Sequence, residues 1–408
     1  MSPIVVLVGL LLLSYAGSFL VGGRTLRGAG LPSGLEYVGL GFLLGPHLLG
    51  IVGREMTAAF EPLGQVAIGW FALVVGLDFG RAQGRRAHVG RMALGLLGSA
   101  LTGGAVAAAV WFYAIRVRHA AADRELLLLA GGLGSAGAET TRHVIRWASE
   151  RHGAAGKLTQ FLGDVAHADD LVPLVAMAAL FSLYPVNLTR VHVPLGGWVG
   201  VTIGFGVVLG AMTAMHIGRE LRVDQTWGVL LGMSVLGVGV AARLALSPMT
   251  VLFFMGWTTA ALSRHRAALR KMVAPVERPI LLPALVLAGA HVDFRGLGPV
   301  AVLLAVAVLA RVVAKLVFGA ALALPFRASP ALGAGLLSSG ALTISVGLSF
   351  AIRFPDSTGN AVLAFAFMTC IVGEIFGPLT LRRALRDAGE IGAEGEGIPS
   401  EAPGTVTR

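Results

Sequence analysis

Charged residues are scarce in this sequence. Asp, Glu, Lys and Arg together make up only 13% of the 408 residues, whereas a soluble domain carries about 25%. Cys370 is the only cysteine, which excludes an intramolecular disulfide. The chain also lacks a metal-ligand cluster, a nucleophile elbow and a phosphate-binding loop, so we expect neither an enzyme nor a cofactor.

Long apolar runs fill the chain instead. Hydrophobic residues make up 55% of it, and the mean hydropathy is +0.79. Since a helix needs about 20 apolar residues to cross a bilayer, the runs predict an all-α polytopic membrane protein. We expect about thirteen spans, the tenth of them short, at residues 3–22, 34–53, 57–79, 91–115, 125–147, 157–184, 195–216, 225–243, 246–263, 277–292, 298–325, 330–353 and 360–381.

The net charge of +10 is explained by the loops between these spans, without any nucleic acid partner. With the N-terminus outside, 21 Lys and Arg fall on cytoplasmic segments and 8 on the opposite side. This bias predicts a multi-pass protein of the cell (inner) membrane with a cytoplasmic C-terminus. Residues 1–385 then form one transmembrane domain, and 386–408 form a disordered cytoplasmic tail with too few apolar residues for a core.

Two adjacent carboxylates, Asp169 and Asp170, lie in the middle of the sixth span. Charged groups at membrane depth are costly, and they usually line an ion or proton path. Neighbouring residues of a helix differ by about 100°, so the two side chains point in different directions. His167 shares a face with Asp170, and Asp164 lies nearer one end of the span, in an aqueous funnel or in a polar helix contact.

The chemistry of this pair favours transport of cations and protons. Desolvation and a neighbouring like charge both favour the protonated form of a carboxyl group. Such a group can release its proton and take up a cation instead. The eleventh span supplies counter-charges, since Arg311 and Lys315 are four residues apart on one helix face. Lys315 is the expected working partner, because a buried lysine changes its protonation state more readily than an arginine; the alternative is a fixed ion pair.

Two spans carry glycines and small polar residues at their centres. The fifth reads LLLLAGGLGSAGAETTRHVI, and the twelfth reads ALGAGLLSSGALTISVGLSF. They are the fifth spans of two six-span halves around the seventh span, which suggests inverted repeats with discontinuous helices. The alternative is close helix packing through small residues. Further candidate site residues in these and neighbouring spans are Ser135, Glu139, Thr140, Ser339 and Glu374, of which Glu139 and Glu374 could instead mark a membrane interface.

Several segments, in the right order, resemble the monovalent cation:proton antiporter-2 family, which includes Kef-like proteins and sodium/proton exchangers. They are GFLLGPHLLGIVG (41–53), VVGLDFG (74–80), ERPILLPALVLAGAHVDF (277–294), ARVVAKLVFGA (310–320) and GEIFGPLTLRRALRDAGE (373–390). The resemblance implies two crossed, unwound helices in a core domain at about 91–184 and 298–381. The remaining helices would form a dimerisation domain, so a homodimer is expected.

The resemblance also implies roles for individual residues. Asp170 would bind the cation and the proton, and Asp169 would pair with Lys315 when the site is empty. The chain departs from the family at the fifth span, where GSAGAETT has no proline. From the aspartate pair, Lys315 and the family resemblance together, we expect exchange of Na+ (or K+/Li+) for H+ across the lipid membrane. The alternatives are a cation channel and a sodium-coupled organic solute symporter of similar fold.

Overall fold

The computed structural model describes residues 34–82, 89–185, 194–217, 223–324, 329 and 332–391, and these residues form helices and connecting segments without a strand. The predicted first span, 3–22, lies outside them. Seven of the described helices are long and apolar enough to cross a membrane. The helices are α2 (Leu35–Leu44), α3 (Arg54–Ala82), α4 (Val89–Arg116), α5 (Arg124–Ala138), α6 (Arg142–His152), α7 (Lys157–Ala168), α8 (Leu171–Phe181), α9 (Leu195–Ile217), α10 (Val223–Arg243), α11 (Pro248–Leu262), α12 (Arg266–His291), η1 (Arg295–Val300), α13 (Ala301–Ala323), α14 (Leu332–Gly335), α15 (Ala341–Arg353) and α16 (Ser357–Asp387).

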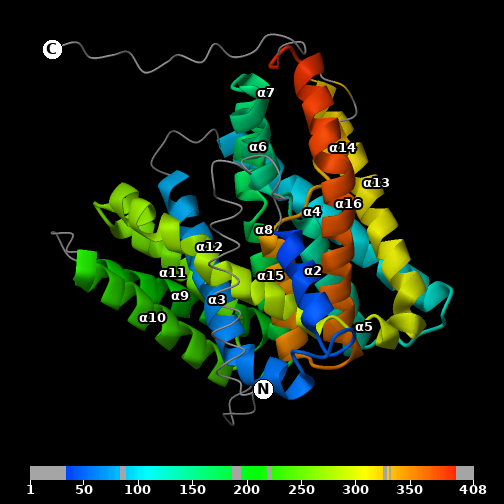
Figure 1. Cartoon of the computed structure of the whole chain (residues 1–408), viewed down its shortest axis with the longest axis horizontal. Coiled ribbons are helices and arrows are strands. Elements are labelled where there is room, and N and C mark those ends of the chain that lie inside the picture. Colours follow the sequence, from blue (N-terminus) through cyan, green and yellow to red (C-terminus); the bar gives the residue numbers. More distant parts are fainter. Residues whose placement is uncertain are drawn as a thin grey trace.

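The helices pack into two groups that lie side by side (Figure 1). One group contains α3, α9, α10, α11 and α12, and the other contains α4 to α8 and α13 to α16. We call these the scaffold group and the core group. Short α2 packs mainly on α12, and α12 and α3 contact α15 where the two groups meet. The assignment of the groups as dimerisation and transport domains stays a prediction.

Two discontinuous spans run through the core group, as the sequence predicts. The fifth span is divided into α5 and α6 by residues 139–141, and the twelfth into α14 and α15 by residues 336–340. The breaks lie against each other, because Thr141 N donates a hydrogen bond to Ser338 O at 3.0 Å. The prediction of two crossed discontinuous helices is therefore confirmed.

A third interruption divides the sixth span into α7 and α8 at the two aspartates, where the sequence predicts one continuous helix. Pro173 explains the break. Proline has no amide hydrogen, so it cannot bond the carbonyl of the residue four positions earlier, which is Asp169. Asp169 O instead accepts from Val172 N at 3.3 Å and from the hydroxyl of Ser99 on α4 at 3.1 Å.

The tenth span is longer than predicted. α12 begins at Arg266 rather than at residue 277 and has 26 residues. The charged residues of its first half interrupt the apolar run, so the sequence pattern predicts only the second half of the helix. One of them, Arg270, is paired with Asp78 of α3 at 2.7 Å and with Glu277 at 2.9 Å, which lets it lie inside the bundle.

The described structure also continues past residue 385, where the predicted tail begins. α16 ends at Asp387. Glu390 then accepts hydrogen bonds from Leu158 N at 2.6 Å and from Thr159 N at 2.9 Å, and so caps the start of α7. Residues 392–408 of the predicted tail lie outside the described residues.

Candidate ion-binding site

The crossing of the two breaks leaves backbone groups without helical partners, and Glu139 satisfies several of them. Glu139 ends α5 and is 3% exposed. Its Oε2 accepts hydrogen bonds from Gly340 N at 3.1 Å and Thr343 N at 2.9 Å, and also from the Thr343 hydroxyl. A carboxylate at the first turn of a helix is favourable, because the exposed amides and the helix dipole both attract negative charge.

Arg311 satisfies the carbonyls of the same crossing. Its guanidinium donates to Gly137 O at 3.0 Å and Glu139 O at 3.1 Å at the first break. At the second break it donates to Leu337 O at 2.8 Å and to the hydroxyl of Ser339 at 2.6 Å. Arg311 therefore joins the two broken spans through one planar side chain, and the predicted candidate Ser339 is one of its partners.

Lys315 lies one turn further along α13 and is also buried. Its Nζ donates to Ala138 O at 2.9 Å and to Thr140 Oγ1 at 2.6 Å. Thr140 N in turn donates to Asp169 Oδ2 at 2.9 Å. The expected pairing of Lys315 with Asp169 is therefore indirect in this structure. The ammonium group of Lys315 donates instead to Ala138 O, which the helix break exposes, and to the hydroxyl of Thr140.

The two aspartates are buried and point to different partners, as their helical spacing predicts. Asp169 is 2% exposed and Asp170 is 5% exposed. Asp169 faces Thr140, and its other oxygen, Oδ1, has no hydrogen-bond partner. Asp170 Oδ2 lies 3.2 Å from Arg142 Nη2.

Arg142 was not among the predicted site residues, although it joins two of them. Besides its contact with Asp170, its Nη1 lies 2.7 Å from His167 Nδ1. A signal was present, since Arg142 follows the break at 139–141 directly and Asp170 had no assigned counter-charge.

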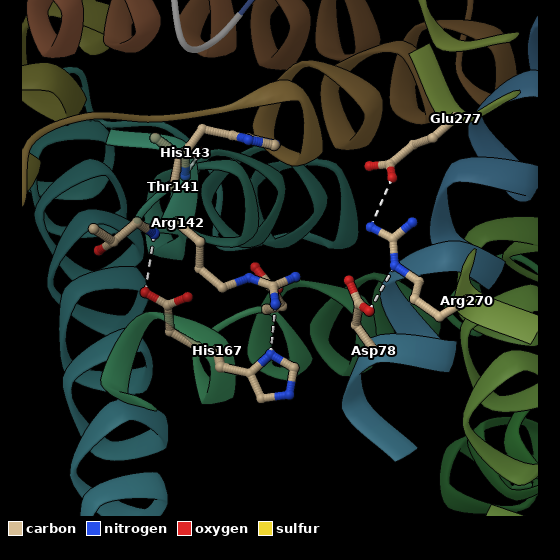
Figure 2. Close-up of polar contacts among 10 residues, drawn as sticks. Asp78, Thr141, Arg142, His143, His167, Arg270 and Glu277 are labelled. Atoms are coloured by element: carbon tan, nitrogen blue, oxygen red, sulfur yellow. Dashed lines mark hydrogen bonds and ion pairs between the residues drawn. The ribbon is translucent and has the colours of Figure 1, made fainter. Parts of the chain in front are cut away.

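A small funnel of about 40 Å³ leads to these residues from between the two helix groups. The core side contributes Glu139, Thr141, Arg142 and Asp170, and the scaffold side is lined by the Asp78, Arg270 and Glu277 ion-pair network. Figure 2 shows Arg142 directed at His167, with this network across from it.

The remaining predicted residues lie outside the contacts around Asp170. Ser135 donates its hydroxyl to Pro173 O at 2.9 Å and so holds α8 to α5. Asp164 is half exposed and pairs with Arg91 of α4 at 3.0 Å, so it is a polar helix contact. Glu374 is half-buried on α16. Within the described residues, no group of three or more His, Cys, Asp or Glu could hold a resident metal ion.

Neither a known protein family nor a curated protein matches this sequence. Solved structures do match. A structure of the sodium proton antiporter MjNhaP1 from Methanocaldococcus jannaschii at pH 8 has a TM-score of 0.63 and 15% identity, over 95% of each chain. A structure of the same antiporter from electron microscopy has a TM-score of 0.66 and 16% identity, over 98% of this chain and 100% of the other. These neighbours are transporters, and the chain has their sodium/proton antiporter-like fold.

Proposed function

We propose that this protein is a secondary active antiporter that exchanges Na+ (or K+ or Li+) for H+ through competitive binding at Asp170. The observation that carries the proposal is the position of Asp170. Its carboxylate is buried beside the crossing of two broken helices, yet it lines a funnel that opens between the core and scaffold groups. Intramembrane carboxylates in such positions mark ion and proton pathways.

The charges around the site support binding of a single extra positive charge. Asp169, Asp170 and Glu139 are the carboxylates of the crossing, and Arg311 and Lys315 are its deeply buried cations. Arg142, 3.2 Å from Asp170, supplies the third positive charge in this structure, and one proton or one monovalent cation on Asp170 balances the set when Arg142 leaves it. Since a carboxylate oxygen that carries a proton is a poor cation ligand, occupancy by one substrate excludes the other. The unpartnered Asp169 Oδ1 is a further oxygen available to a cation.

We assign the transport movement to a displacement of the core group against the scaffold group. The funnel is lined from both groups, so a relative movement would change access to Asp170. The scaffold helices α9 and α10 expose apolar side chains, including Val208, Met215, Leu231 and Val235. We assign the predicted homodimer contact to these helices. The resemblance to the monovalent cation:proton antiporter-2 family supports the same arrangement.

The test is exchange measured in proteoliposomes that contain a pH-sensitive dye. We expect Na+, Li+ or K+ gradients to drive proton movement, and Asp170→Asn to abolish it. Asp164→Asn is the matched control, since it removes a carboxylate from the same span at an exposed pair. Exchange by Asp170→Asn at the normal rate would refute the assignment of the site.

The same preparation separates the alternatives. A cation channel would conduct Na+ without obligatory proton movement, and a solute symporter would need an organic substrate for either flux. Repeating the assay with the membrane potential clamped and unclamped measures whether exchange is electrogenic, since each net charge moved responds to the potential by about 2.3 kcal/mol per 100 mV.

A further inference from the structure

We infer that Arg142 acts as a tethered cation, which occupies the Asp170 carboxylate in the empty carrier and competes with the transported ion. This inference rests on the proposed function. Its starting point is that the Arg142 guanidinium, at 3.2 Å, is the one ion-pair partner of Asp170 within the described residues. The guanidinium therefore occupies the space beside Asp170 Oδ2 that a cation bound to this oxygen would need.

The position of Arg142 in the chain explains how it can move. It is the first residue of α6, directly after the break, where the Thr141 side chain caps the helix by accepting from His143 N. The long Arg142 side chain reaches back toward the start of α8. The side chain is 26% exposed and lines the funnel, whereas the Asp170 side chain is 7% exposed. A cation that enters the funnel therefore meets Arg142 in front of the carboxylate.

A comparison with Arg311 separates this role from a structural one. Arg311 is 1% exposed and binds three backbone carbonyls and one hydroxyl, which hold the crossing together. Among the residues that the structure describes, Arg142 binds the side chains of Asp170 and His167 and no backbone group. When it leaves Asp170, no backbone group loses a partner, and water in the funnel can solvate the freed guanidinium.

His167 gives Arg142 a second acceptor beside Asp170. A guanidinium has donors only, so His167 Nδ1 must be the acceptor of the 2.7 Å contact, and the neutral ring carries its hydrogen on Nε2. The ring is held by packing against Phe79, with centroids 5.2 Å apart. His167 can thus keep Arg142 on one side of the funnel while a cation occupies Asp170.

Competition of this kind has a measurable consequence. An ion that must displace a tethered competitor shows a weaker apparent affinity than the carboxylate itself would give. We expect Arg142→Gln to lower the KM for Na+ by about threefold or more, as removal of a partly exposed ion pair implies. A purely structural pair would instead reduce thermal stability and the exchange rate and leave KM unchanged.

The His167 variants test the same idea in the opposite direction. In His167→Leu, Arg142 loses its second acceptor and stays on Asp170, so the KM for Na+ should rise. His167→Asn keeps an acceptor oxygen near the position of Nδ1 and should restore a KM close to the original. Thermal unfolding of each variant in detergent shows whether the fold is retained.

The experiment is Na+-driven proton exchange in proteoliposomes, with KM and kcat measured for the unmodified protein, Arg142→Gln, both His167 variants and Asp170→Asn. A lower KM in Arg142→Gln together with a higher KM in His167→Leu supports the inference. An unchanged or higher KM in Arg142→Gln overturns it. If Arg142→Gln does not fold, His167→Leu decides the matter. An unchanged KM for Na+ in His167→Leu then overturns the inference, and a higher KM supports it. Normal exchange by Asp170→Asn would instead refute the proposed function.

Discussion

Glu139, directly after α5, caps α15 across the crossing of the two broken spans, with its Oε2 accepting a hydrogen bond from Thr343 N at 2.9 Å. The same oxygen accepts from Gly340 N at 3.1 Å, at a helix whose own first residues offer no side-chain cap. A single carboxylate thus fixes the end of one broken helix to the start of the other. Glu139 therefore contributes to the structure of the crossing through this cap.

The first prediction concerns this cap. In Glu139→Ala, two buried amides lose their acceptor, and the free energy of unfolding should fall by about 1–3 kcal/mol. Glu139→Gln keeps an acceptor oxygen without the charge, so its loss should be smaller. Thermal unfolding in detergent measures both. Equal midpoints for Glu139→Ala and the unmodified protein would show that the cap does not stabilise the crossing.

The second prediction concerns the shape of Arg311. Lysine has the same charge but no planar fork, so it cannot bind both breaks at once. We expect Arg311→Lys to lower the free energy of unfolding by about 2–4 kcal/mol, because several buried carbonyls lose donors. Arg118→Lys is the control, since Arg118 is exposed and donates to Pro299 O at 3.3 Å, and it should change stability by less than about 0.5 kcal/mol. Similar losses in the two variants would contradict the role of the fork.

The third prediction concerns the indirect link between Lys315 and Asp169 through Thr140. If Thr140 couples the two charges, a double-mutant cycle of Lys315→Met and Asp169→Asn should show an interaction of about 0.5–3 kcal/mol in unfolding free energy. The double variant should then be less damaged than the sum of the single variants. Repeating the cycle in a Thr140→Val background, which removes the hydroxyl, should reduce the interaction. An unchanged value there would mean that the charges act on each other directly.

Much of the site could be predicted from local sequence alone. The aspartate pair and Arg311 with Lys315 are charges at membrane depth, and such charges are conspicuous in an apolar chain. The glycine-rich centres of two spans identified the breaks because small residues are where membrane helices unwind. In each case the signal lies in a few consecutive residues.

The contacts made by these residues could not be predicted in the same way. Which carbonyl Lys315 binds depends on the atoms that the break exposes, and these are defined only once two distant spans cross. Arg142 was missed because an arginine near a span end is usually explained by topology. Ser99 was missed because its role depends on Pro173, which denies the Asp169 carbonyl its usual helical donor, and on the packing of α4 beside that carbonyl.

The last prediction concerns the rigidity of the scaffold group, which depends on glycines where α3 and α11 touch. A methyl group added at Gly256 would overlap the carbonyl of Leu73, and no flexible side chain could move aside. Gly256→Ala should therefore destabilise the protein by about 1–3 kcal/mol. Gly232 of α10 has nothing within 4 Å of such a methyl group, so Gly232→Ala should stabilise its helix by about 0.5–1 kcal/mol. Thermal unfolding in detergent should give midpoints that shift in opposite directions, and a shift of the same sign in both variants would show that the close α3–α11 contact does not limit stability.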